Sequence, residues 1–165
     1  LSKMAERYGA DAVTLYNMGQ AALSRGNLPE ASSRFERALR LDPTDPDIHQ
    51  ALGNTLAASG DLEGALSRFQ RAVDLSPCFA AALSNRGAAQ LQLGRIDEAI
   101  ASYRKAIDCD PDYAVAYKNL AAAWLRRGRL DRAIASLREA VRLTPDDTEL
   151  EATLQELERQ QARRP

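Results

Sequence analysis

Residues 60–77 read GDLEGALSRFQRAVDLSP, and residues 94–111 repeat the pattern as GRIDEAIASYRKAIDCDP. The same frame recurs at residues 26–43 and 128–145, so one glycine, two alanines and one proline return every 34 residues. The glycines are Gly26, Gly60, Gly94 and Gly128, and the prolines are Pro43, Pro77, Pro111 and Pro145. A fixed period of this length predicts a stack of similar helical units rather than one irregular globule.

Each period contains two helical patterns separated by its glycine. In residues 46–79, apolar residues recur at spacings of three and four on both sides of Gly60, as on one face of a helix. Gly60 can adopt the left-handed conformation that ends a helix, and Asp61 can cap the next one. Pro77 lacks a backbone N–H and disfavours helix at the residue before it, so the chain is expected to turn there.

The period divides the chain into four helix–turn–helix units, which are residues 12–45, 46–79, 80–113 and 114–147. Residues 148–165 are predicted to form a capping helix and tail, because leucines line only one side of an otherwise polar segment. Residues 1–11 suggest a partial helix of an incomplete preceding unit, which favours a fragment of a longer protein.

Small and large residues alternate between the two helices of a unit. One position of the first helix holds Gly19, Gly53, Gly87 and Ala121, and one position of the second helix holds Phe35, Phe69, Tyr103 and Leu137. We expect each large side chain to fill the space that the small residue leaves, since a bulkier residue there would overpack the core.

This pattern resembles the tetratricopeptide repeat family, whose 34-residue units share the small residue, the two alanines, the aromatic residue and the proline at these places. The resemblance covers residues 12–147, with modest departures at Ala121, at Leu137 and at Arg86, which stands where Met18, Leu52 and Leu120 stand in the other units. It implies an all-α fold, a right-handed α-solenoid of four helix–turn–helix units plus a C-terminal capping helix.

Composition and motifs argue against several classes of function. The chain has 22 basic and 23 acidic residues and a formal charge of -1, so no net field attracts nucleic acid or an anionic membrane. No phosphate-binding or nucleophile-elbow glycine motif occurs. The single histidine, His49, is expected to be a half-buried packing residue. We therefore expect no enzyme, no cofactor, no metal, and no nucleic-acid or membrane partner.

The two cysteines, Cys78 and Cys109, are 31 residues apart and form no C-x-x-C pair. Cys109 occupies a position that leucine holds in the other units, so we expect a free, buried thiol that packs like a small hydrophobe. A disulfide is the less favoured alternative. This interpretation fits a reducing, cytoplasmic compartment.

In the family that the sequence resembles, first helices line a concave groove and second helices form the convex back. Carried over by position, this implies peptide contacts from ten residues: Tyr16, Asn17, Gln20, Gln50, Asn54, Ser84, Asn85, Lys118, Asn119 and Arg126. Apolar contacts are expected from Val13, Leu91, Val115 and Leu125. Most charged residues lie on the second helices and turns, so the groove is expected to be rich in amides.

Asparagine recurs at one first-helix position, in Asn17, Asn85 and Asn119, and Ala51 interrupts the series. Asparagine is a poor helix former, whereas its amide can both donate to and accept from a peptide backbone. The series resembles the asparagine ladder in the repeats of protein O-linked N-acetylglucosamine transferases. The alternative is that these amides bond only to neighbouring helices or solvent. A carboxylate clamp for chaperone tails is not expected, because its cations are missing.

The sequence thus predicts a scaffold or adaptor that binds an extended segment of a protein partner in its groove. Two alternatives stay open: self-assembly into a homo-oligomer, and a substrate-recruiting module cut from a larger protein, for example a glycosyltransferase. Aspartates in the turns, such as Asp45 and Asp110, are expected to cap helices rather than to bind a metal ion.

Overall fold

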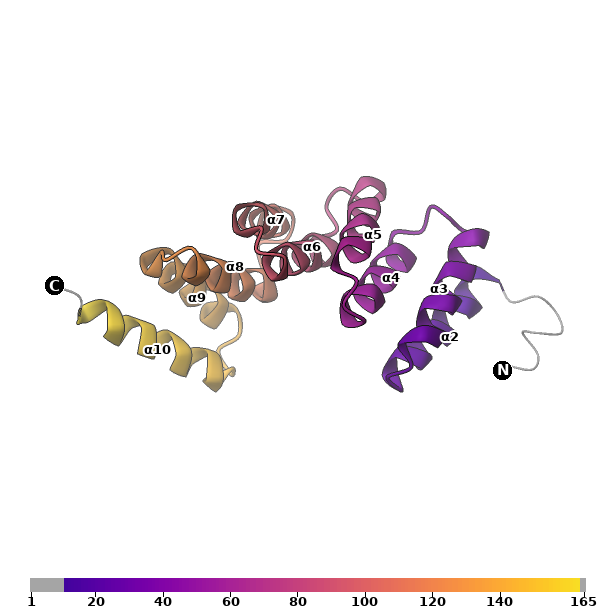
Figure 1. Ribbon diagram of the computed structural model, residues 1–165. Coiled ribbons are helices and arrows are strands. Elements are labelled where there is room, and N and C mark those ends of the chain that lie inside the picture. The colour runs from indigo at the N-terminus through magenta and orange to yellow at the C-terminus, as the bar shows by residue number, and fades with distance from the viewer. Residues whose placement is uncertain (1–10, 164–165) are drawn as a thin grey trace. The chain divides into compact units, whose positions relative to one another are not determined.

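The computed structural model describes residues 11–163, which form nine α-helices and no strand (Figure 1). The helix predicted within residues 1–11 lies outside this range, except for Asp11. The described chain consists of two compact units. Unit 1 ends at Pro77 and contains the four helices α2 (Ala12–Ser24), α3 (Leu28–Leu41), α4 (Pro46–Ala58) and α5 (Leu62–Leu75). Unit 2 begins at Cys78 and contains α6 (Ala80–Gln92), α7 (Ile96–Cys109), α8 (Ala114–Arg126), α9 (Leu130–Leu143) and α10 (Thr148–Ala162).

Each unit is built from antiparallel helix pairs stacked in chain order. In unit 1, α2 packs on α3, α3 on α4, and α4 on α5. In unit 2, the pairs are α6 with α7 and α8 with α9, and α10 covers α9 as the predicted terminal helix. Both helices of a pair contribute buried apolar residues to the interior between them, so each helix buries its apolar face against the other. Each unit, as far as residues 11–163 describe it, is therefore an all-α stack of helix pairs, as the period predicted.

A glycine with positive φ ends the first helix of every pair. Its φ is 73° at Gly26, 91° at Gly60, 77° at Gly94 and 74° at Gly128. The N–H of the following residue donates back to a carbonyl five residues earlier, as from Asp61 to Leu56 at 2.9 Å. Only glycine adopts this backbone at low cost, which explains its return in each period.

Aspartates in the turns cap helices at several of the predicted places. Asp61 Oδ1 accepts from the N–H of Gly64 at 2.9 Å, and Asp45 Oδ1 accepts from Asp47 at 2.8 Å. Both carboxylates lie at the positive end of a helix, where they satisfy otherwise unpaired donors. Asp110 differs, because it accepts from Asp112 within the turn and α8 has no side-chain cap.

The predicted small–large contact forms the centre of the first three helix pairs. A Cβ atom built on Gly53 would lie 2.6 Å from Cε1 of Phe69, and one on Gly19 would lie 2.5 Å from Cε1 of Phe35. Gly87 stands in the same relation to Tyr103. The aromatic ring therefore rests directly on the glycine backbone, which requires the absence of a side chain at that position.

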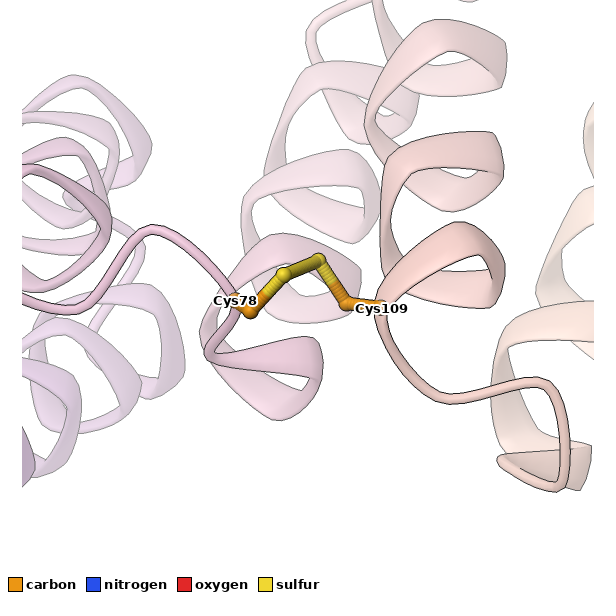
Figure 2. Close-up of a disulfide and its surroundings, with 2 residues drawn as sticks. All are labelled: Cys78 and Cys109. Atoms are coloured by element: carbon orange, nitrogen blue, oxygen red, sulfur yellow. A yellow bond between two sulfur atoms is a disulfide. The ribbon is translucent and has the colours of Figure 1, made fainter.

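A disulfide joins Cys78 to Cys109, so the expectation of free thiols was wrong (Figure 2). Cys78 lies in the turn before α6 and Cys109 is the last residue of α7, and their Cα atoms are 5.1 Å apart. The antiparallel pairing of α6 and α7 brings the beginning of the first helix next to the end of the second. Only in this unit of the repeat do both places hold cysteine.

Candidate functional site

In unit 1, the predicted contact residues lie on α2 and α4 with accessible side chains. Gln20 Nε2 donates to the hydroxyl of Tyr16 at 2.8 Å, and the Tyr16 ring packs 5.8 Å from that of Phe35. Tyr16 is thereby fixed against the core while its hydroxyl remains near the surface. Asn17 and Asn54 are exposed, and Gln50 is half-buried. These residues stay predicted contacts.

In unit 2, a hydrogen bond orients one of the asparagines. Asn119 Nδ2 donates to Ser84 Oγ at 3.3 Å, which joins α8 to α6. Ser84 is 0% exposed, so it lies too deep to contact a ligand and instead supports Asn119. Asn119 and Asn85 are half-buried at equivalent positions of neighbouring first helices. The bond leaves the carbonyl oxygen and one N–H of the Asn119 amide for another partner.

Arg126 has a structural contact that the sequence did not reveal. Its Nη1 donates to the carbonyl of Leu91 at 2.8 Å, near the end of α6. This bond satisfies a helix-end carbonyl of the preceding pair. Arg126 is nevertheless exposed, and its guanidinium has further N–H donors.

Large apolar side chains are exposed on the same helices. Val13 on α2 is 66% exposed, and Val115 and Leu125 on α8 are 49% and 40% exposed. Leu91 is 8% exposed and belongs to the core of unit 2, so its predicted role as an apolar ligand contact is not possible without rearrangement.

A pocket of about 180 Å³ opens between α8 and α10 in unit 2. We call it the α8–α10 pocket, and its lining residues are Lys118, Ala121, Ala122, Leu125, Leu137, Glu149, Leu150 and Thr153. The floor is apolar, with Lys118 contributed by one helix and Glu149 by the other. Two of the departures from the repeat pattern, Ala121 and Leu137, line this pocket, so a smaller side chain occupies the place of the aromatic ring. These two substitutions were visible in the sequence and could have indicated a pocket. The sequence did not show that α10 would form one of its walls.

A cluster of three arginines, Arg127, Arg129 and Arg132, extends from the turn after α8 into the first turn of α9, and each has a partner within unit 2. Arg132 lies over the ring of Trp124 at 4.6 Å, Arg127 pairs with Asp97 at 3.2 Å, and Arg129 approaches Asp131 at 3.7 Å. Internal partners of this kind lower the charge that the cluster offers to an outside ligand.

His49 is more deeply buried than expected, at 5% exposed. Its Nε2 lies 3.1 Å from the carbonyl of Pro43, and its Nδ1 has no hydrogen-bond partner among the described residues. Burial is the main cause that lowers the pKa of His49, and the nearby charges of Arg68 and Arg71 lower it further. In unit 2, burial raises the pKa of Tyr103 to about 12.

Within residues 11–163, no group of three or more His, Cys, Asp or Glu side chains gathers in a way that could hold a metal ion. In the same range, no helix has both the length and the apolar content needed to cross a membrane.

Family models match nearly the whole helical region. Models described as tetratricopeptide repeat cover residues 16–77, 50–114 and 90–157. This chain belongs to the tetratricopeptide repeat family. Tetratricopeptide repeats serve as scaffolds for protein interaction, and none of the matched models is a catalytic family. Among curated proteins, no sequence relative is found.

Solved tetratricopeptide repeat proteins share the fold. TTC0263, a thermophilic protein of Thermus thermophilus, is 24% identical with a TM-score of 0.80, over 94% of this chain and 86% of that one. MamA is 23% identical with a TM-score of 0.81, over 90% and 86% of the two chains. YrrB, described as having an unusual peptide-binding site, is 26% identical with a TM-score of 0.76, over 92% and 78%.

Proposed function

We propose that this tetratricopeptide repeat protein is an adaptor that binds an extended segment of a partner protein along its first helices. The observation that carries this proposal is the amide of Asn119, which hydrogen-bonds to Ser84 from a helix that also carries the exposed apolar residues Val115 and Leu125. An amide positioned before the ligand arrives loses little side-chain entropy on binding. The similarity to YrrB, a protein with a peptide-binding site, supports the same function.

The chemistry of this face suits a peptide backbone. The Asn119 oxygen can accept from a backbone N–H, and its remaining N–H can donate to a backbone carbonyl. Asn85 stands at the same position one repeat earlier, and Asn17 does so in unit 1. Each such bond adds about 0.5–1.5 kcal/mol. The same three asparagines carry the resemblance to the asparagine ladder of protein O-linked N-acetylglucosamine transferases.

The test compares the full chain with a variant in which Asn17, Asn85 and Asn119 are alanine. Amide chemical shifts are recorded while a set of blocked extended peptides is added. Binding that maps to α6 and α8 in unit 2, or to α2 in unit 1, in the original chain and is at least tenfold weaker in the variant would support the proposal. Binding that is equally strong in the variant would make the asparagines structural and leave the ladder without a function.

A matched control keeps the binding group and removes its internal support. Changing Ser84 to alanine removes only the partner of Asn119, so the amide stays present but is no longer held. We expect weaker peptide binding with a smaller loss than in the triple variant. The melting temperature of each variant separates loss of binding from loss of folding.

A further inference from the structure

The α8–α10 pocket occurs where the repeat pattern changes. In the first three helix pairs, an aromatic ring rests on glycine and fills the space between first and second helices. In the fourth pair, Leu137 replaces the ring and Ala121 replaces the glycine, and both line the pocket. Leu150 of α10 lines it as well. The pocket therefore lies at the one described pair in which leucine and alanine stand in place of the aromatic ring and the glycine.

We propose that the α8–α10 pocket takes an aliphatic side chain of the bound peptide, and that Lys118 pairs with an acidic residue next to it. The inference rests on the proposed function and adds a preference for particular residues. Concave sites that are mostly apolar and carry a few polar groups at their edge are the usual form of ligand pockets.

The two opposite charges at the pocket indicate on which side an acidic residue would bind. Lys118 is exposed, and its ammonium group makes no hydrogen bond or ion pair with any residue in the described range. Glu149 contributes the opposite charge from the first turn of α10. An acidic peptide residue is therefore attracted on the α8 side and repelled on the α10 side. A peptide carboxylate that reaches Lys118 would form a charge-assisted hydrogen bond, which is stronger than a neutral one.

The probes are four blocked octapeptides of glycine and serine with a central dipeptide, which is Asp-Leu, Asp-Ala, Lys-Leu or Asn-Leu. We follow amide chemical shifts of the full chain as each peptide is added. We expect Asp-Leu to shift the amides of Ala121, Leu125 and Leu150. Replacing Leu by Ala in the peptide should weaken binding at least tenfold, and replacing Asp by Lys should weaken it several-fold at low salt.

Two variants test the pocket, and a third is the control. The double variant A121G/L137F restores the glycine–aromatic pair of the other repeats, so it is expected to fold while filling the pocket. It should lose the preference for Leu over Ala. The variant K118Q should lose the preference for Asp over Lys and keep the preference for Leu. The control K105Q removes an exposed lysine of α7 and should change neither preference.

The possible results distinguish failure of the pocket inference from failure of the proposed function. If peptides shift Asn85 and Asn119 but Leu and Ala bind equally well, the pocket inference is wrong and the proposed function stands. A preference for Leu that persists in a folded A121G/L137F protein would also overturn the inference. If none of the four peptides shifts any amide of the original chain, the proposed function fails together with the inference.

Discussion

Changing Gly53 to alanine should destabilise the protein, although alanine is the better helix former. The new Cβ would lie 2.6 Å from Cε1, 2.8 Å from Cδ1 and 3.1 Å from Cζ of Phe69, where 3.4–4 Å is ordinary contact. Phe69 is 1% exposed, so the ring has no free space into which to move. Overpacking of this kind costs about 1–3 kcal/mol. The helix propensity of alanine returns about 0.5–1 kcal/mol, so the middle of the two ranges leaves a net loss of about 1 kcal/mol.

The fourth repeat suggests how the loss can be compensated. It contains alanine and leucine at these two positions, Ala121 and Leu137. The double variant G53A/F69L copies that pair, so the two changes should be coupled favourably by about 0.5–3 kcal/mol. The single variant F69L should be destabilised, because it leaves a gap beside glycine.

Urea denaturation of the four proteins gives the coupling energy from their free energies of unfolding. The variant Ala58→Gly, at an exposed position of α4, measures the propensity difference without a core contact. The reasoning would be refuted by a G53A protein as stable as the original, or by a coupling energy near zero. Either result would mean that the aromatic ring moves without cost.

Three further predictions concern the disulfide, the buried histidine and a helix cap. Cys78→Ser should lower the free energy of unfolding by about 3–4 kcal/mol under oxidising conditions, because the disulfide joins residues 31 positions apart. In reductant, the original protein and the variant should have the same free energy of unfolding. A difference between them that persists in reductant would contradict this explanation. Since the pKa of His49 is lowered in the folded state, the unfolded chain binds more protons below the ordinary value of 6.5, so stability should fall as the pH drops through 6.5 and below it. In His49→Leu this component of the pH dependence should be absent, and equal slopes of stability against pH would count against it. Asp61→Ala should cost about 0.5–2 kcal/mol in thermal or urea unfolding through loss of its bond to Gly64, whereas Asp61→Asn should keep most of the stability.

The fold could be predicted from the sequence because each period repeats local features that determine where helices end and how the two helices of a pair pack. The positive-φ glycine recurs in all four periods, the glycine–aromatic contact in the first three, and a capping Asn or Asp before the second helix in the first two. The disulfide was missed because its two ends are adjacent only after α6 and α7 pair. A comparison of the turn before a first helix with the end of the same unit would have found it.

The site was less predictable, because burial and partners depend on packing between repeats. Ser84 and Leu91 occupy positions that the family resemblance places in the groove, yet both are covered in the structure. The bond between Arg126 and the Leu91 carbonyl spans 35 residues, about one period, so it connects equivalent regions of neighbouring repeats. Contacts between residues one repeat apart depend on how neighbouring repeats stack, and a single sequence contains no pattern that predicts them.

The disulfide between Cys78 and Cys109 also affects the order in which parts of the protein unfold. In a linear array each repeat is supported only by its neighbours, so opening normally starts at the ends and spreads inward. The disulfide within the α6–α7 pair restricts the partly unfolded conformations that this pair can adopt. The amide hydrogens of α6 and α7 should then be among the last to exchange in the oxidised protein. Reduction would remove this protection, so the redox state of the surroundings would determine where along the chain unfolding can begin.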